Sequence, residues 1–479
     1  MKSPRILAVA AVLAVGSVVA AQEIRKPEVA GSFYPSEAKA LSDSVNHFLK
    51  WPRTVYPGGD GLLGIVAPHA GYQFSGQTAG LAYSQLLGRK VRTVFVLGPS
   101  HRQSYRGIAF HHADSWETPL GRIRVDTAIE KEILGIYHPS QLLDSAFSRE
   151  HSIEDQLPFI QQVLGDVHIV PIAMGAMQLS DFAALSAILS KLLESYNGTA
   201  IVIASSDMSH YKSASQTLAR DSVAIKDVLT LDPDKLAADL DNGDAEFCGY
   251  GPVLTLMMVA ERSGATPHFI GYSNSSQATG DTSRVVGYGA FSFTFPPVTK
   301  ALDSLERREL LRIARLSLDS LIIAGHSPSI QVNDTVLLRK QGAFVTLSKN
   351  GALRGCIGYI SPVTPLAQVV YNVAQSAAAK DPRFSTVKPD ELKNIEVEIS
   401  ALGPLRRVRT LDQIVLGTTG LYIQKGQKTG ILLPQVPGQF GWNREQFLQQ
   451  LAVKAGLQPE DWKAPDAKIY SFTAQVFRE

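Results

Sequence analysis

Residues 201–210 read IVIASSDMSH, an apolar run that ends abruptly in polar side chains. The branched apolar residues before Ala204 are typical of a strand that is buried on both faces, as in a parallel sheet. Asp207 and His210 follow directly behind the strand that we predict over 199–206. In open α/β sheets the functional crevice lies beyond the carboxyl ends of the strands. The stretch therefore predicts both an α/β fold and the position of its site.

Three further apolar segments between Gly61 and Phe295 have the same character. They are LLGIVAP (62–68), VRTVFVLG (91–98) and VHIVPIAM (167–174). Apolar residues at helical spacing lie between these strands, at 75–88 and 179–196. This alternation predicts an α/β domain with a mostly parallel sheet. Residues 283–295 alternate in character and predict an added edge or antiparallel strand.

The pattern stops at Phe295-Pro296-Pro297, and 479 residues exceed what one ordinary core accommodates. We therefore predict two domains, at 22–297 and 298–479. The second begins with apolar residues at helical spacing over 302–325. The remainder mixes strands with two helical stretches, which favours a smaller α+β domain.

The first 21 residues have the pattern of a secretory signal peptide. Lys2 and Arg5 precede an apolar run, and small residues lead up to Ala21. We expect cleavage before Gln22, export to the periplasm or the extracellular space, and no stable membrane span in the mature chain. Cleavage removes two of 46 positive charges and none of 44 negative ones, which leaves a formally neutral chain. Nucleic acid is therefore not expected as a partner.

Histidines stand at the ends of two other predicted strands. His69 follows 62–68, and His101 follows 91–98. Together with His210 they occupy the same topological position, so we expect the three imidazoles to converge beyond one edge of the sheet. Such a group beside a carboxylate binds zinc, iron or copper. Asp207 is expected to ligate as well, or to fix the tautomer of His210.

A fourth histidine and one cysteine complete the candidate site. His151 precedes Ser152, which has the character of a helix cap with acidic residues in the first turn, so His151 is a candidate acid/base group. Cys248 precedes a predicted helix, whose dipole is expected to stabilise a thiolate there. Cys248 is thus a candidate soft ligand, although a buried inert thiol is the alternative.

Five motifs occur in the order found in the Memo family: APHAGYQFSG, LGPSH, EHSIEDQLPF, SSDMSHY and FCGYGP. The resemblance spans roughly residues 26–295. It implies a fold similar to LigB-type class III extradiol dioxygenases, which are non-haem iron enzymes. Those enzymes hold iron with two histidines and a glutamate, whereas this chain offers Cys248 in the third place. The resemblance implies that His69 and His101 are metal ligands. It also implies that Asp207 and His210 line the pocket, where we expect Tyr72 to bind substrate.

The second domain resembles the AMMECR family, in the stretches ALRGCIGYI (352–360), KDPRF (380–384), VEISAL (397–402) and ILLPQVP (431–437). Cys356 in the first stretch is either a nucleophilic or redox thiol or a buried strand cysteine. In the first case Arg354, Asp381 and Arg383 gather around it and bind substrate. In the second case, Asp381 and Arg383 form an ordinary ion pair. The two domains together resemble components of the AmmeMemoRadiSam system, which implies a radical-SAM partner.

Three function classes follow from these residues. The leading hypothesis is an exported metal-dependent redox enzyme, with iron as the metal and copper or zinc as alternatives, acting on a small organic substrate. In it His69, His101 and Cys248 hold the metal, while His210, oriented by Asp207, transfers protons. The second class is a zinc-type hydrolase that uses metal-activated water. The third is a non-catalytic metal-binding or scaffold protein whose second domain docks a partner.

Overall fold

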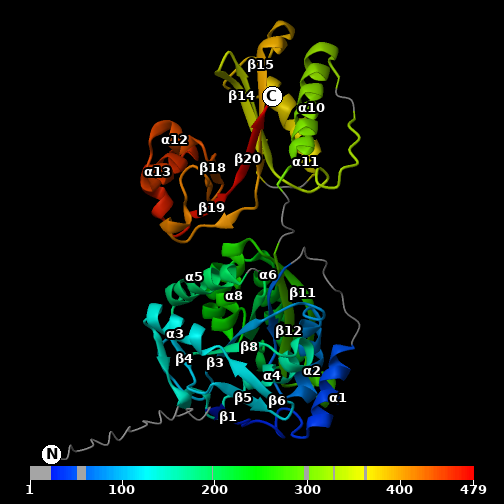
Figure 1. The fold of residues 1–479 in the computed structure, drawn as a ribbon, viewed down its shortest axis with the longest axis vertical. Coiled ribbons are helices and arrows are strands. Elements are labelled where there is room, and N and C mark those ends of the chain that lie inside the picture. Colours follow the sequence, from blue (N-terminus) through cyan, green and yellow to red (C-terminus); the bar gives the residue numbers. More distant parts are fainter. Residues whose placement is uncertain (1–22, 51–60, 197, 296–300, 327–328, 361–363) are drawn as a thin grey trace, which may run out of the picture.

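The computed structural model describes residues 23–50, 61–196, 198–295, 301–326, 329–360 and 364–479 (Figure 1). The expected signal peptide at 1–21 and the expected boundary at Pro297 lie outside these residues. Within the described ranges, no helix combines the length and the apolar character that crossing a membrane requires.

The first domain contains a 12-stranded sheet whose centre is parallel, as predicted. Its central order is β8-β3-β9-β2, and every neighbouring pair in this series is parallel. The antiparallel strand β12 is added beside β2, which confirms the prediction for 283–295. The bounds of these strands are β2 Leu62–Ala67, β3 Thr93–Pro99, β8 His168–Met174, β9 Ala200–Ser205 and β12 Val285–Thr294.

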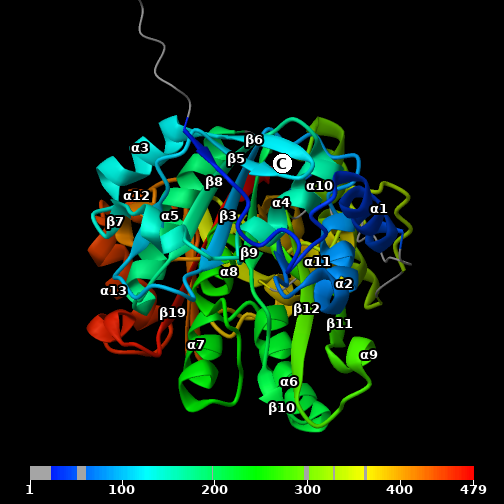
Figure 2. The ribbon, with the colours of Figure 1, turned by 90° about the horizontal axis from the view of Figure 1, so that it is seen from below.

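Helices cover both faces of this sheet (Figure 2). Alternate residues of the central strands enter two separate apolar cores, one on each face. This explains why the strands carry almost no polar residue before their ends. The helices are α1 Ala38–Leu49, α2 Tyr72–Ser84, α3 Thr127–Ile136, α4 Leu157–Leu164, α5 Leu179–Ser195, α6 Ala214–Thr230, α7 Pro233–Asn242, α8 Tyr250–Ser263 and α9 Ser276–Thr279. The other strands are β1 Ile24–Arg25, β4 Ile108–Phe110, β5 Ser115–Thr118, β6 Gly121–Val125, β7 Ser140–Leu142, β10 His210–Lys212 and β11 Thr266–Asn274.

The second domain is the smaller α+β unit that the sequence predicts, with two antiparallel sheets and a separate core on each. The first sheet has the order β14-β13-β15-β20 and the second β16-β19-β17-β18. The strands are β13 Ala343–Lys349, β14 Ala352–Tyr359, β15 Ile395–Leu402, β16 Arg406–Arg407, β17 Gly420–Lys425, β18 Lys428–Leu432, β19 Lys468–Phe472 and β20 Ala474–Arg478. The α-helices are α10 Ser304–Asp319, α11 Leu366–Ala379, α12 Val436–Phe440 and α13 Arg444–Lys454.

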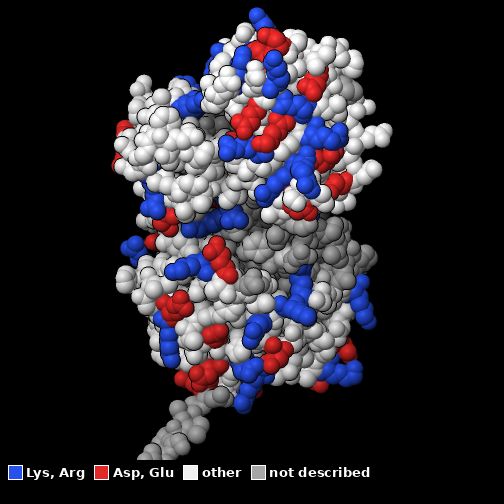
Figure 3. All heavy atoms as spheres, turned by 45° about the horizontal axis from the view of Figure 1, so that its top comes forward, with Lys and Arg blue, Asp and Glu red and all other residues white. Residues whose placement is uncertain are grey.

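Ion pairs join the second sheet of this domain to the first domain. Arg409 contacts Glu261 at 2.7 Å and Asp234 at 3.3 Å, and Lys468 contacts Asp232 at 2.5 Å. Figure 3 shows basic and acidic side chains mixed over both domains, without a field of one sign, on the face that it presents. This mixture agrees with the absence of a basic footprint in the sequence.

A buried ion pair fixes the N-terminal segment across the first domain. Arg25 contacts Glu154 at 2.7 Å, and neither side chain is more than 3% exposed. The carboxylate of Glu154 also accepts hydrogen bonds from the backbone N–H groups of Glu28 and Val29 and from the Tyr34 hydroxyl. Glu154, one of the acidic residues that the sequence placed in the first turn of a helix, is therefore the anchor of residues 25–34.

Replacing Glu154 with Gln should destabilise the fold strongly, because Arg25 would keep a buried charge without its counterion. Loss of one partner of a buried pair costs about 3–5 kcal/mol. Urea unfolding followed by fluorescence would measure it. Glu117→Gln is the matched control, since Glu117 pairs with Lys26 in the same segment at the surface. Equal losses in the two variants would contradict the anchoring role.

Candidate metal centre

The ends of strands β2, β3 and β9 bring His69, His101 and Asp207 to one cavity of about 740 Å³. Its wall combines ligand-type side chains with aromatic ones and two arginines. Its lining includes Phe33, His69, Phe74, His101, Arg102, His151, Asp207, His210, Tyr211, Cys248, Arg284 and Tyr288. His210, the third imidazole that the sequence predicts at this carboxyl edge, also lines the cavity.

The ring of His69 has a defined tautomer. Its Nδ1 lies 2.8 Å from Ser205 Oγ. Ser205 has one hydroxyl hydrogen, which it donates to the carbonyl of Ser152 at 2.5 Å, so it accepts from His69. The hydrogen of His69 is therefore on Nδ1, and the lone pair of Nε2 accepts from the Cys248 thiol or, once that proton is lost, can bind a cation. Burial, then the neighbouring His101, lowers the pKa of His69 well below its ordinary value and keeps the ring neutral.

Two further rings are held in the same way. His101 Nδ1 lies 2.9 Å from Glu150 Oε1, and His210 Nδ1 lies 2.7 Å from the carbonyl of Met208. Burial raises the pKa of Glu150, but hydrogen bonds from the His101 ring and from backbone N–H groups outweigh it and lower the pKa to about 2. Glu150 is thus an ionised acceptor. Each ring places a hydrogen on Nδ1 and can offer Nε2 to a metal. Histidines that bind metals commonly have this arrangement, in which the other ring nitrogen donates a hydrogen bond.

Cys248 lies against His69, with its Sγ 3.1 Å from Nε2 of that ring. The backbone N–H of Asp207 donates to the same sulfur at 3.2 Å. Burial, then the charge of Asp207, raises the pKa of the thiol well above its ordinary value. The expectation that the start of α8 stabilises a free thiolate is therefore wrong. A bound cation is what would remove this proton.

Asp207 does not orient His210, which is a second correction. Its carboxylate accepts hydrogen bonds from the backbone N–H groups of His69 at 2.8 Å and Ala70 at 3.3 Å. It therefore holds the turn that follows β2, while the carbonyl of Met208 orients His210.

His151 is the least satisfied ring in the cavity. Its Nδ1 is buried without a hydrogen-bond partner, and Glu150 is 3.6 Å away. The ring is stacked between Phe33 at 4.4 Å and His101 at 4.8 Å. Burial, followed by the charge of His69, lowers the pKa of His151 to about 3, so the ring is neutral.

Two ligand groups overlap at His69 within the described residues. Potential ligand atoms of His69, His101 and His151 lie within 4.8 Å of one another, and so do those of His69, Asp207 and Cys248. His210 belongs to neither group and lies in the cavity wall. Neutral imidazoles with a thiol and a carboxylate fit iron, copper or zinc, and they do not fit magnesium or calcium.

Comparison with known proteins identifies the families of both domains. The model of the Memo family, described as Memo-like protein, matches residues 25–292. The chain belongs to the Memo family. The model of the AMMECR1 family matches residues 311–477, so the Memo domain is fused here to an AMMECR1 domain.

Similar proteins and one similar solved structure come from several organisms. A MEMO1 family protein of Pyrobaculum aerophilum is 37% identical over 278 residues, which cover 56% of this chain and 99% of that protein. One of Methanobrevibacter smithii is 34% identical over 280 residues, with the same coverage of both chains. The crystal structure of an uncharacterized protein from Pyrococcus horikoshii is 38% identical, covers 36% of this chain and 90% of that chain, and has a TM-score of 0.35.

Two predicted residues of the Memo domain lie elsewhere than expected. Tyr72 is buried in the core, where its hydroxyl donates to the carbonyl of Asp155, and it does not line the cavity. Ser152 does not cap a helix, because α4 begins only at Leu157 and the Ser152 hydroxyl donates to the carbonyl of Pro99. That hydrogen bond joins the His151 loop to the end of β3.

The predicted residues of the AMMECR1 domain form two ion pairs near Cys356. Asp381 pairs with Arg383 at 2.7 Å and accepts a hydrogen bond from the backbone N–H of Cys356. Arg354 pairs instead with Glu391 at 2.9 Å. The Cys356 sulfur accepts from the hydroxyl of Thr346 at 3.3 Å. A role of Cys356 in catalysis stays a prediction.

Sequence reasoning missed Glu150, Ser205 and Gln156. Gln156 donates to the carbonyl of Pro68 at 3.0 Å and to Ser205 Oγ at 2.9 Å. Two signals were present: Glu150 directly precedes His151, and Ser205 is the last residue of the buried strand β9. The partner of Ser205 follows only from the parallel register, which places Ser205 beside Ala67, two residues before His69.

Replacing Ser205 with Ala should release the tautomer of His69, because its Nδ1–H loses the hydroxyl acceptor in a buried place. In the metal-free protein, 15N spectra of labelled histidine should show His69 protonated on Nδ1. The variant should show a mixture of tautomers. Ser222→Ala, on the exposed side of α6, should leave the His69 signals unchanged. An unchanged His69 signal in Ser205→Ala would contradict the assigned hydrogen bond.

Proposed function

We propose that the cavity binds iron and that the protein is a non-haem-metal oxidoreductase acting on a small organic molecule. The observation that carries this is that acceptors engage the Nδ1–H groups of His69 and His101, so that the Nε2 atoms are available to a cation, with the Cys248 thiol 3.1 Å from Nε2 of His69. His69 is common to both ligand groups and is the central ligand of the proposal. His101 and Cys248 complete the ligand set that the family resemblance implies.

The orphaned Nδ1 of His151 supports a cation in this place, since a buried ring nitrogen without a partner is costly unless something else satisfies it. Copper meets the same donor requirements as iron. Either metal would supply one-electron redox chemistry, which imidazole and carboxylate side chains do not supply.

The chain's own residues would bind and orient the substrate and transfer protons. His210 holds its Nδ1–H on the carbonyl of Met208, which leaves Nε2 to accept or donate a proton in the cavity. Phe33, Phe74 and Tyr288 supply apolar wall. The volume of about 740 Å³ suits a small molecule.

The double variant His69→Ala, His101→Ala should lose the metal while the chain stays folded, because both rings lie at the cavity and leave the two cores intact. Mass spectrometry on anaerobically purified protein, wild type beside variant, measures the metal content. The matched control replaces two exposed histidines, His47 and His138, with alanine.

Iron or copper lost only from the site variant would support the oxidoreductase. Zinc lost only from the site variant would instead favour the zinc-type hydrolase, because zinc activates water and carries no redox chemistry. If the site variant kept all of its metal, the proposal that this cavity is the metal site would be wrong.

We also propose that the chain is exported, supported by the charged, apolar and small-residue pattern of its first 21 residues. The exported protein should begin at Gln22. N-terminal sequencing of the protein from the periplasm or medium would establish this, and an intact Met1 on the functional protein would contradict it. The radical-SAM partner stays a prediction of the family resemblance.

A further inference from the structure

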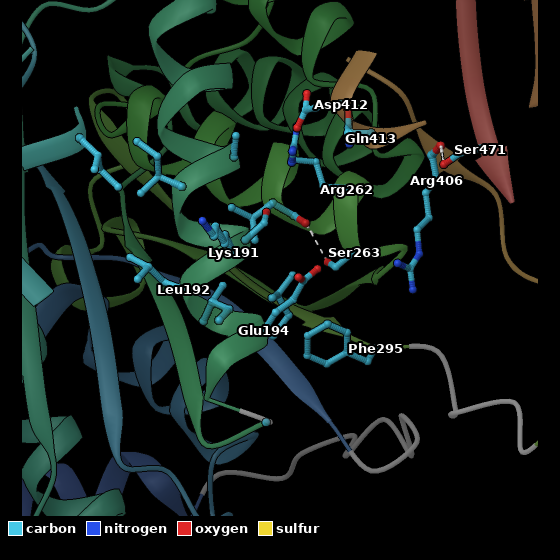
Figure 4. Close-up of a pocket in the computed structure, with 18 of the residues that line it drawn as sticks. Lys191, Leu192, Glu194, Arg262, Ser263, Phe295, Arg406, Asp412, Gln413 and Ser471 are labelled. Atoms are coloured by element: carbon cyan, nitrogen blue, oxygen red, sulfur yellow. Dashed lines mark hydrogen bonds between the residues drawn. The ribbon is translucent and has the colours of Figure 1, made fainter. Parts of the chain in front are cut away.

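A second cavity, of about 960 Å³, lies between the two domains and apart from the metal centre. The first domain contributes α5 and the end of α8, and the second contributes residues of β16, β19 and the 411–415 segment. Figure 4 shows Arg262 reaching in from α8 and Arg406 from the opposite domain. The cavity therefore exists only when both domains are present.

Arg262 lies in this wall near the charge of Asp412. It is half-buried at the end of α8, and among the described residues no ion pair or hydrogen bond involves its guanidinium. Burial lowers the pKa of Arg262, and the nearby charge of Asp412 does not offset this effect. A partly buried guanidinium without a partner is costly, and an anion placed against it would recover that cost.

Arg406 provides a second cation in the same cavity. Its stem packs over Gly264, where an added Cβ would lie 3.6 Å from the Arg406 Cγ, and this contact positions the guanidinium. Among the described residues its guanidinium also has no ion pair. Three acids, Glu132, Glu194 and Asp412, line the cavity too, but they are exposed and remain solvated.

The remaining wall is largely apolar. Leu63, Val259 and Phe295 belong to the first domain, and Val415 comes from the second. A volume near 1,000 Å³ with an apolar lining and a few polar groups is typical of small-molecule sites. The two arginines and the apolar wall together fit a ligand that has an anionic group at one end and a carbon body at the other.

We propose that the cavity between the domains binds a small organic anion with an apolar body. Its anionic group lies between Arg262 and Arg406. Its carbon body lies against Leu63, Val259 and Phe295. This site is independent of the metal centre, so either proposal can fail without the other.

The test is calorimetric titration of the full-length, metal-free protein with octanoate, and with 1-octanol as the uncharged probe of the same body. We expect one saturable octanoate site per chain and at least tenfold weaker binding of 1-octanol. Octyl phosphate is the third probe. If it binds more tightly than octanoate, the site prefers a phosphate head group, and if it binds more weakly, the site prefers a carboxylate.

Arg262→Met and Arg406→Met should each weaken octanoate binding about tenfold or more, since each removes a charged donor and keeps most of the stem volume. Arg406 is exposed, so its variant tests the proposal even where Arg262→Met folds poorly. Arg308→Met, at an exposed position of α10, is the control and should bind as wild type does. Equal affinity for octanoate and octanol, unchanged binding in Arg406→Met, or no binding by wild type would overturn the proposal.

Discussion

The hydroxyl of Ser205 is the hydrogen-bonding centre on which the site depends. Its single hydrogen goes to the carbonyl of Ser152, and it accepts from the ring of His69 and the side chain of Gln156. One buried atom thus joins the end of β9, the end of β2 and the loop that carries His151. Because a buried polar atom must satisfy its bonds, none of these three segments moves without a cost to the other two.

Close backbone approach makes this junction possible. A Cβ on Gly98, at the end of β3, would lie 2.5 Å from Ile153 and 2.6 Å from the Ser152 hydroxyl. A Cβ on Gly249 would lie 2.3 Å from the carbonyl of Ser205. Glycine is required at both positions because any larger residue would push the His151 loop or Cys248 away from the strand ends.

The sequence predicted the fold and the principal members of the site, because both follow from local patterns. Continuous apolar strands predicted the parallel sheet, and the sheet determined where His69, His101 and Asp207 would meet. The errors concern partners. Tyr72, Asp207 and Glu154 are polar residues of the type that lines a site, yet their hydrogen bonds go to backbone and to a buried arginine. Such partners are set by tertiary packing, which residue type and spacing do not reveal.

Helix α8 connects the candidate metal centre with the second domain. Residues 251–260 of this helix are all buried, so it is fixed along its length. Cys248 precedes its first turn, and Glu261, at its last turn, pairs with Arg409 of the second domain. Breaking the Glu261–Arg409 pair would leave a partly buried charge at the end of α8. The start of the same helix places the Cys248 sulfur against His69. The contact between the domains therefore helps to fix the element that carries a candidate ligand, which gives the fusion of the two domains a physical consequence.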